Sequence, residues 1–155
     1  MPDKQPTVMV EDAKIIFRNF TGKEGPYNRK GQRNFCVILD EDVVEDLVRD
    51  GWNVKYTNPR EEGDVPTPYL PVEVSYNNYP PKITTITSTG RTILDEDMVE
   101  MLDFADIEKI DLIVNAYDWT VRDESGRKAY LKTMFVTINE DELEKKYAVK
   151  KAGGG

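Results

Sequence analysis

Hydrophobic and polar residues alternate over the longest distance between residues 110 and 138, and the rest of the chain can be organised around this stretch. Alternation with a period of two is typical of β-strands whose two sides meet different surroundings. The stretch predicts an antiparallel hairpin with strands over residues 110–122 and 127–138. Its polar turn is expected at residues 123–126, where a glycine follows two acidic residues and a serine.

The alternation sorts the side chains of this hairpin onto two faces. One face is expected to join the core and contains Leu112, Val114, Ala116, Leu131, Thr133 and Phe135. The other contains Asn115, Tyr117, Trp119, Val121, Lys128, Tyr130, Lys132 and Met134, with Trp119 opposite Tyr130. Aromatic rings beside ammonium groups suit a single nucleic-acid strand, because bases stack on rings and phosphates attract cations. The alternative is that Trp119 and Tyr130 form a cross-strand pair that only stabilises the hairpin.

Shorter stretches rich in β-branched and aromatic residues predict further strands. They cover residues 7–10, 13–17, 33–39, 52–56, 69–76 and 83–87. Pro71 indicates an edge strand or a strand start, because proline cannot donate a hydrogen bond to a neighbouring strand. Residues 19–31 and 57–68 are rich in glycine, proline and polar side chains and are expected to be loops.

Three acidic stretches that each follow an apolar residue are expected to start helices. They cover residues 39–42, 94–97 and 138–141. In them Asp40, Asp95 and Asn139 can cap a helix, and the acids that follow favour its positive end. An amphipathic run follows each cap, and the second predicts a helix over residues 96–103. A metal-binding carboxylate cluster is the alternative, but caps account for all three stretches.

The composition fits one globular domain, since 39% of the 155 residues are hydrophobic and 32% are charged. No apolar run approaches the roughly 20 residues that span a membrane, and the N-terminus lacks the apolar core of a signal peptide. We therefore expect a single domain over residues 1–148, a disordered tail over residues 149–155, no membrane contact and a cytoplasmic location.

The absence of histidine narrows the chemistry that this chain can perform. It excludes Cys-His and Ser-His catalysis and zinc sites that contain histidine. The single cysteine, Cys36, lies in the apolar run 35–39 and is expected to be a small buried residue rather than a nucleophile. We expect no enzyme activity, no metal and no cofactor.

Charge is unevenly distributed along the chain. The formal net charge of −8 disfavours nonspecific binding of duplex DNA by a uniformly basic surface. Residues 14–33 nevertheless contain six cations and one anion, and we call these cations the basic stripe. They are Lys14, Arg18, Lys23, Arg29, Lys30 and Arg33, with Phe20 and Tyr27 between them. A basic stripe on an acidic body indicates a local anion-binding site, and an ordinary solvated loop is the alternative.

The order of the elements predicts a mainly β fold with short helices. Without residues 50–67, the chain runs through a strand, a basic loop, further strands, a helix and two long strands. This is the order of an OB-fold, a partly open five-stranded barrel that binds oligonucleotides on the face of its second and third strands. Two loops contribute to that face, and here they would be residues 21–32 and 123–126. We expect an OB-fold-like five-stranded barrel with an inserted helix and an extra hairpin.

Four stretches of the chain resemble the small single-stranded-DNA-binding proteins encoded in the replication and recombination modules of tailed bacteriophages. They are residues 16–25 (IFRNFTGKEG), 33–37 (RNFCV), 50–55 (DGWNVK) and 128–132 (KAYLK). The resemblance covers residues 14–147, and the closing hairpin is similar in layout to that of bacterial single-stranded-DNA-binding proteins. The bacterial proteins end in an acidic tip that recruits partner enzymes, whereas this chain ends KKAGGG, so the resemblance does not imply recruitment through such a tip.

The resemblance implies a non-catalytic protein of phage replication or recombination that binds single-stranded DNA with little sequence preference inside the host bacterium. The expected partners are single-stranded DNA, replication and recombination proteins of phage or host, and a second copy of the chain in a homodimer. The alternative is an acidic interaction protein that mimics DNA and binds a host protein. A basic stripe beside Trp119 and Tyr130 favours DNA binding, whereas a stripe buried in a subunit contact favours the alternative.

The candidate binding residues combine the basic stripe and its aromatic neighbours with the outer face of the hairpin. They are Lys14, Arg18, Phe20, Lys23, Tyr27, Arg29, Lys30, Arg33, Tyr117, Trp119, Lys128, Tyr130 and Lys132. Each base that stacks on a ring contributes about 1–3 kcal/mol, and each cation displaces counterions from phosphate. Trp52 follows Gly51 at the corner between a helix and a strand, and we expect it to anchor the core instead.

Overall fold

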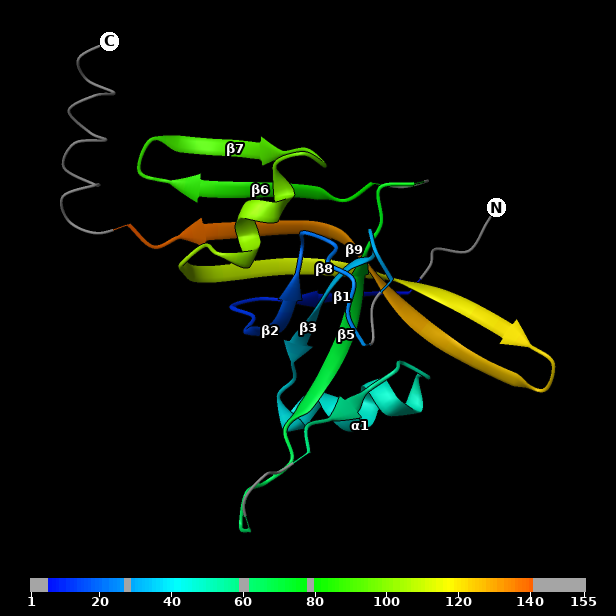
Figure 1. Cartoon of the computed structure of the whole chain (residues 1–155). Coiled ribbons are helices and arrows are strands. Elements are labelled where there is room, and N and C mark those ends of the chain that lie inside the picture. The colour runs from blue at the N-terminus through cyan, green and yellow to red at the C-terminus, as the bar shows by residue number, and fades with distance from the viewer. Residues whose placement is uncertain (1–5, 27–28, 59–61, 78–79, 141–155) are drawn as a thin grey trace, which may run out of the picture.

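The computed structural model describes residues 6–26, 29–58, 62–77 and 80–140. These residues form nine strands, one α-helix and one short 3-10 helix (Figure 1). The elements are β1 (Thr7–Val10), β2 (Ile15–Asn19), β3 (Arg33–Ile38), α1 (Glu41–Arg49), β4 (Lys55–Tyr56), β5 (Pro68–Val74), β6 (Lys82–Thr87), β7 (Gly90–Leu94), η1 (Val99–Asp103), β8 (Ile107–Val121) and β9 (Glu124–Ile138). The predicted mainly β fold with short helices is confirmed.

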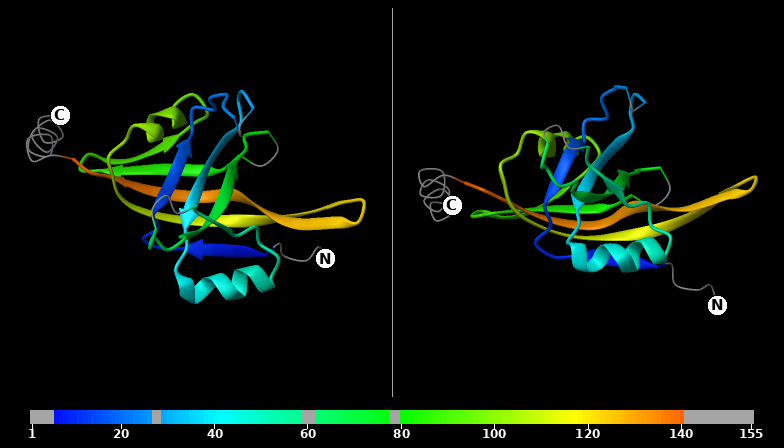
Figure 2. Two further views of the ribbon diagram at one scale, coloured as in Figure 1. Left: turned by 60° about the horizontal axis from the view of Figure 1, so that its bottom comes forward. Right: turned by 90° about the horizontal axis from the view of Figure 1, so that it is seen from below.

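The strands β1, β8, β9, β5, β3 and β2 follow one another as hydrogen-bonded neighbours in one sheet. All of these neighbours are antiparallel except β5 and β9, which run parallel. The strands β2, β3, β5, β8 and β9 therefore correspond, in chain order, to the five strands of an OB-fold barrel. The strands β2, β3 and β5 cross over β8 and β9, as the views in Figures 1 and 2 agree. The expected OB-fold-like barrel is confirmed.

The extra hairpin consists of β6 and β7 and extends the sheet beside the second half of β9. The strand β9 thus pairs with β5 near its middle and with β6 further along, on the edge away from β8. The sequence pattern predicts β6 but not β7. Outward residues of β7 such as Ile93 are exposed, and only Leu94 of this strand is buried, so β7 lacks the pattern of a half-buried strand.

Alternate residues of the strands build the core inside the barrel. On β5, Leu70, Val72 and Val74 are buried, and the residues between them are half-buried. Leu47 of α1 and Trp52 belong to the same buried cluster. The guanidinium carbon of Arg127 lies 5.6 Å from the ring centre of Trp52. The predicted role of Trp52 as an anchor of the core is confirmed by its burial.

The long hairpin formed by β8 and β9 exists, but its predicted turn is wrong. Arg122 and Asp123 alone join the strands, and Arg122 adopts the left-handed conformation with φ of 56°. Gly126 consequently lies within β9, directly opposite Trp119. Tyr130, which the predicted register placed opposite Trp119, lies four residues further along β9. Gly126 suggested a turn, but glycine within a strand also permits a close approach by another group.

A bulge at Lys132 changes the faces of the hairpin. Leu131 and Thr133 pair with consecutive residues of β8, so Lys132 is left out of the register. Beyond one extra residue, each side chain of the strand points to the face opposite to the one that simple alternation predicts. Met134 is therefore buried, whereas Thr133 and Phe135, which were expected in the core, are half-buried on the opposite face.

The expectation that Pro71 marks an edge strand or a strand start is also wrong. It lies in the interior of β5, which has β3 on one side and both β4 and β9 on the other. The strand β4 pairs with residues 68–69 and β9 with residues 72–73. Pro71 falls between these two pairings, where a missing N–H group interrupts neither of them.

Two of the three predicted helices lie within the described residues. The first is α1, with Asp40 at its N-cap position but without a side-chain hydrogen bond there. The second is reduced to η1, and the Asp95 carboxylate before it accepts hydrogen bonds from the backbone of Asp97 and Met98. The third helix and the predicted tail lie outside the described residues. No helix within the described ranges is long and apolar enough to cross a membrane.

Candidate nucleic-acid interface

Three aromatic rings and one lysine share the outward face of the β8–β9 hairpin. The rings of Tyr117 and Tyr130 meet edge to face, with their centres 5.7 Å apart. Lys128 is the cross-strand partner of Tyr117, and its Nζ lies 5.5 Å from the ring centre of Tyr130. The observed register differs from the predicted one by an even number of residues near the turn. Trp119 therefore still shares this face with the other three side chains.

Trp119 lies nearer to the tip of the hairpin, and 37% of its surface is exposed. Its indole ring covers the backbone of Gly126, since a Cβ atom at that position would come within 2.8 Å of the ring. The ring is therefore supported by the partner strand and still open to solvent. This is the arrangement that a base-stacking platform requires.

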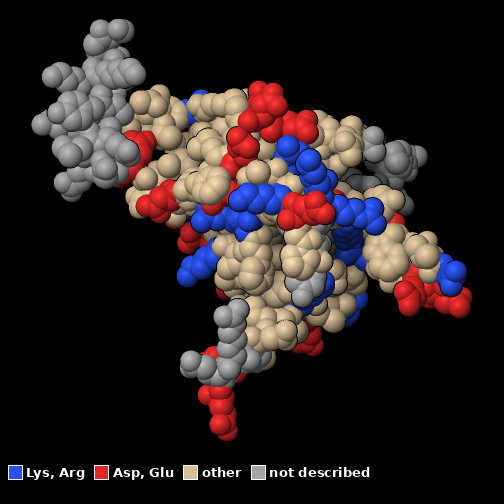
Figure 3. Space-filling model, in the orientation of Figure 1, with Lys and Arg blue, Asp and Glu red and all other residues tan. Residues whose placement is uncertain are grey.

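A hollow of about 590 Å³ opens beside the hairpin face, between the β2–β3 connection, the end of β5 and β9. The cations that line it are Arg29, Lys30, Arg33 and Lys128. Figure 3 shows Lys and Arg side chains across the middle of this side of the molecule, with acidic side chains among and around them. Part of the basic stripe thus lies beside Lys128, and so beside Tyr130.

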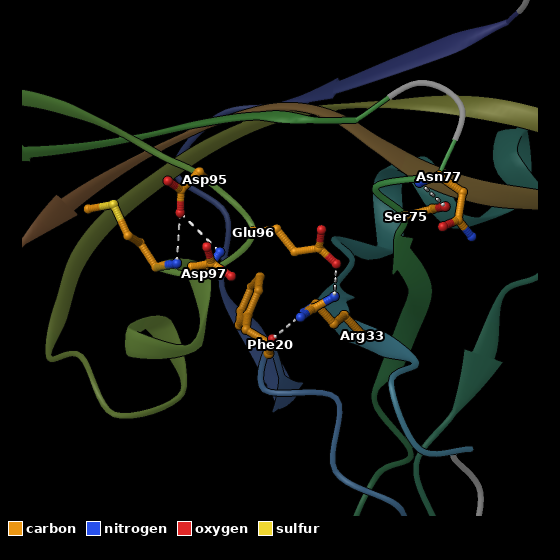
Figure 4. A network of polar contacts seen from close by, with 8 residues as sticks. Phe20, Arg33, Ser75, Asn77, Asp95, Glu96 and Asp97 are labelled. Carbon is orange, nitrogen blue, oxygen red and sulfur yellow. Dashed lines mark hydrogen bonds and ion pairs between the residues drawn. The ribbon is translucent and has the colours of Figure 1, made fainter.

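Two carboxylates are paired with cations of this hollow. Glu96 Oε1 lies 3.1 Å from Arg33 Nη1 (Figure 4). Glu73 Oε2 lies 2.5 Å from Lys128 Nζ. Phosphate oxygens bind guanidinium and ammonium groups in the same way as carboxylate oxygens do. The two glutamates therefore occupy positions where an incoming phosphate could bind.

Backbone contacts fix both ends of the β2–β3 connection beside the hollow. Arg33 Nε donates to the carbonyl of Phe20 at 3.0 Å, and its guanidinium lies 5.6 Å from the ring centre of Tyr76. The carboxylate of Asp103 accepts hydrogen bonds from the N–H groups of Phe20 and Thr21 at 2.6 and 2.9 Å. These bonds hold the ends of the connection in one position, which limits the ordering cost of binding.

The protonation states at the hairpin face follow from burial and from Glu73. Burial lowers the pKa of Lys128, but the carboxylate of Glu73 outweighs it, and the resulting pKa lies above its ordinary value. Burial, together with the nearby Glu73, raises the pKa of Tyr130. At neutral pH, Lys128 is therefore a cation and Tyr130 a neutral phenol.

Two of the predicted binding residues have structural roles in the fold. Phe20 is completely buried and stacks on Phe35, with ring centres 5.2 Å apart. Arg18 Nη1 donates to the carbonyls of Leu102 and Ala105, each at 2.9 Å. A base cannot reach the ring of Phe20, and Arg18 holds β2 against η1. Phe20 is therefore not part of the candidate interface, whereas Arg18 is exposed and its participation stays a prediction.

Three other predicted residues that the structure describes are not brought together at the hollow. Lys14, Lys23 and Lys132 are exposed, but they are not among the described residues that line it. Tyr27 lies outside the described residues. The participation of these four residues stays a prediction.

The sequence pattern did not identify three further aromatic residues, one at the hollow and two on the outward face of β2 and β5. Tyr76 lines the hollow. Phe17 is 63% exposed, and its ring meets that of Tyr69 edge to face at 5.7 Å between centres. The alternation along β5 could have placed Tyr69 on the outward face. No sequence signal could have indicated the outward ring of Phe17, because it depends on a φ of 53°.

The family model described as "Putative phage ssDNA-binding domain" matches residues 3–152, nearly the whole chain. The chain belongs to this family. The resemblance to phage single-stranded-DNA-binding proteins expected from the four sequence stretches is thus confirmed. No curated protein matches this chain.

Solved structures of one phage protein share the fold of this domain. The single-stranded DNA-binding protein from bacteriophage Enc34, truncated at its C-terminus, gives a TM-score of 0.56 at 7% identity and covers 87% of each chain. The same protein in complex with single-stranded DNA gives 0.57 at 7% identity, over 87% of this chain and 88% of that chain. A third structure of it gives 0.50 at 10% identity, over 87% and 82%. At these identities the similarity shows the fold alone.

Proposed function

We propose that this phage domain is a non-catalytic protein that binds single-stranded DNA with little sequence preference. Bases stack on Trp119, Tyr117 and Tyr130, while phosphates bind the cations around the hollow. Stacking tolerates any sequence because every base has an aromatic face, and bases paired inside a duplex cannot reach the rings.

One observation carries this proposal: Lys128 belongs both to the aromatic face of the hairpin and to the lining of the basic hollow. A strand whose bases lie on the hairpin can therefore place its backbone beside Arg29, Lys30 and Arg33 without leaving the surface. Further support comes from the Enc34 protein, which shares the fold and whose structure was solved in complex with single-stranded DNA.

A role in phage replication or recombination belongs to the same proposal and rests on family membership. Protein partners from phage or host, a homodimer and a location in the host cytoplasm stay predictions from the sequence. The position of the basic stripe distinguishes a DNA-binding protein from an acidic protein that mimics DNA. Half of its cations line the hollow beside the hairpin, which favours DNA binding.

The test is a titration of tryptophan fluorescence with oligo-dT and with a hairpin duplex. We expect quenching and tight binding with oligo-dT and weaker binding with the duplex. Four cations at the hollow predict a slope near −3 for log K against log salt, since single strands give about −0.7 per phosphate contact. Affinity should then fall about 50-fold between roughly 50 and 200 mM salt.

Equal affinity for duplex and oligo-dT would exclude stacking as the basis of recognition. A flat response to salt would instead show that the cations of the hollow do not meet phosphate. The alternative, a protein that mimics DNA, predicts no quenching by oligo-dT at either salt concentration.

A further inference from the structure

A second pair of aromatic rings lies on the outward face of β2, β3 and β5. On β3, Phe35 and Val37 are buried, so Cys36 between them points outward. On β5 the same alternation turns Tyr69 and Glu73 outward. Glu73 is the register partner of Tyr130 in β9. The outward face of β5 is thus continuous with the hairpin face that carries Tyr130.

Phe17 reaches this face through an unusual backbone conformation. The pairing of β2 with β3 shifts between Ile16 and Asn19, and within this irregularity Phe17 has a φ of 53°. A bulky side chain rarely adopts such a conformation, and strained residues cluster at functional sites. The fold does not need this ring in its core, because 63% of Phe17 is exposed.

The two rings are placed to accept a base rather than to fill the interior. Phe17 meets Tyr69 edge to face at 5.7 Å between ring centres. Neither ring is among the described residues that form the hydrophobic core or pack against it. Lys55 is the cross-strand partner of Tyr69 in β4 and is exposed, so a cation stands beside the rings. An exposed ring beside a half-buried one, with an adjacent cation, has the chemistry of single-strand binding.

We propose that Phe17 and Tyr69 form a second base-stacking subsite for single-stranded DNA, with Lys55 as its phosphate contact. This inference rests on the proposed function and extends the binding surface beyond the hairpin. Tyr69 lies four residues before Glu73, the first residue of β5 that lines the hollow, which places the subsite about 13 Å from the edge of the hollow at 3.3 Å per residue. A strand that occupies both regions must therefore be longer than one that occupies the hairpin and hollow alone.

The length of the oligonucleotide separates the two subsites. OB-folds bind roughly 4 to 16 nucleotides, so we compare oligo-dT of about 4 and about 16 nucleotides. The test variant is Phe17→Gly, because glycine accepts a positive φ and the variant should fold at least as well as the parent protein. We expect about tenfold weaker binding of the longer oligonucleotide and unchanged binding of the shorter one. Phe17→Trp should retain the affinity, since it keeps a stacking ring.

A matched control is Ile93→Ala on β7, because Ile93 is similarly exposed, at 61%, but lies on the β6–β7 hairpin. It should bind both oligonucleotides like the parent protein. A thermal melt of each variant shows that all are folded. Wild-type affinity of Phe17→Gly for the longer oligonucleotide would overturn the second subsite.

The outcome also separates this inference from the proposed function. If the parent protein fails to bind either oligonucleotide, the proposed function itself fails. If the parent protein binds and Trp119→Ala weakens binding while Phe17→Gly does not, the hairpin surface stands and only the second subsite is lost. If folded Phe17→Gly bound both the longer and the shorter oligo-dT more weakly, that would also contradict the inference, because the shorter strand should not reach Phe17.

Discussion

The indole ring of Trp119 lies against the backbone of Gly126, the residue directly opposite it across the β8–β9 hairpin. Any larger residue at position 126 would meet the ring, because even a Cβ atom would be only 2.8 Å from it. The contact explains why a glycine occurs within a long strand, where it has no turn to form. It also supports one side of the ring and leaves part of the ring open to solvent.

Gly126→Ala should therefore displace the Trp119 ring without unfolding the protein. We expect the tryptophan emission to shift to longer wavelength as the ring moves into solvent. Affinity for oligo-dT should fall, but by less than the about 1–3 kcal/mol that removal of a stacking ring costs. Ser125→Ala, one residue away, is the control and should change neither property. An unchanged spectrum for Gly126→Ala would show that the ring can tilt aside without leaving its position.

The two tryptophans should respond to truncation in opposite ways. Trp119→Ala should weaken oligo-dT binding by about 1–3 kcal/mol, with little effect on the melting temperature, because a partly exposed ring leaves no cavity. Trp52→Ala should cost about 3–5 kcal/mol of stability, because Trp52 is buried in the core beneath Arg127. Thermal melts and titrations of both variants, run side by side, check this. If Trp119→Ala melted early and Trp52→Ala melted near wild type, the hairpin faces would be assigned the wrong way round.

Glu96→Gln should strengthen the binding of oligo-dT. The change removes a carboxylate that pairs with Arg33 at 3.1 Å and leaves the guanidinium free for phosphate. Exposed ion pairs contribute about 0.2–1 kcal/mol, so we expect an increase in affinity of about 1.4- to 5-fold. The measurement is a fluorescence titration at low salt.

The control for Glu96→Gln is Glu45→Gln on α1, which changes the net charge equally but lies away from the hollow. If both variants gained the same affinity, the effect would come from net charge alone. If Glu96→Gln gained nothing, phosphate would not replace Glu96 at Arg33.

Cys36 should make the protein less stable at alkaline pH. Burial, opposed in part by the charge of Lys55, raises the pKa of its thiol from 9.0 to about 11. Above pH 9 the unfolded chain therefore releases this proton while the folded protein retains it, and the free energy of unfolding falls between pH 9 and 11. Urea denaturation at several pH values across this window measures the decline.

Cys36→Ala should reduce that decline, because it removes one of the groups whose protonation is linked to folding. Lys128, Tyr76 and Tyr130 also have raised pKa values and will still contribute in the variant. The difference between the two proteins isolates the thiol. Identical pH profiles would show that the thiol titrates at the same pH in the folded and unfolded protein.

Alternation along the chain was sufficient to predict the hairpin, most of the other strands and the order of an OB-fold. Side-chain alternation is a local property that the strand geometry imposes directly. The same local pattern correctly put Tyr117, Trp119, Lys128 and Tyr130 on one face, although the predicted turn was wrong. An error of an even number of residues leaves the faces of a strand unchanged, so the grouping did not depend on the exact register.

Charge along the chain predicted that a basic segment exists, but not which of its cations gather at the hollow. Arg29 and Lys30 line the hollow, whereas Arg18 binds the carbonyls of Leu102 and Ala105. Phe20 similarly lies in the core against Phe35. These partners are brought together only when distant segments pack, so the segment's own composition does not indicate them.

Two further features depend on irregular backbone conformations that the sequence pattern does not predict. The bulge at Lys132 exchanges the faces of β9 beyond it and buries Met134 in place of Phe135. The positive φ of Phe17 turns its ring toward Tyr69 on the outward face. Residue types and spacing report the average preference of a segment, whereas a single irregular residue is selected by the packing of the strands around it. Residue order along the chain therefore determines which strands form and which side chains share a face, while contacts between distant strands determine which of those side chains remain available to DNA.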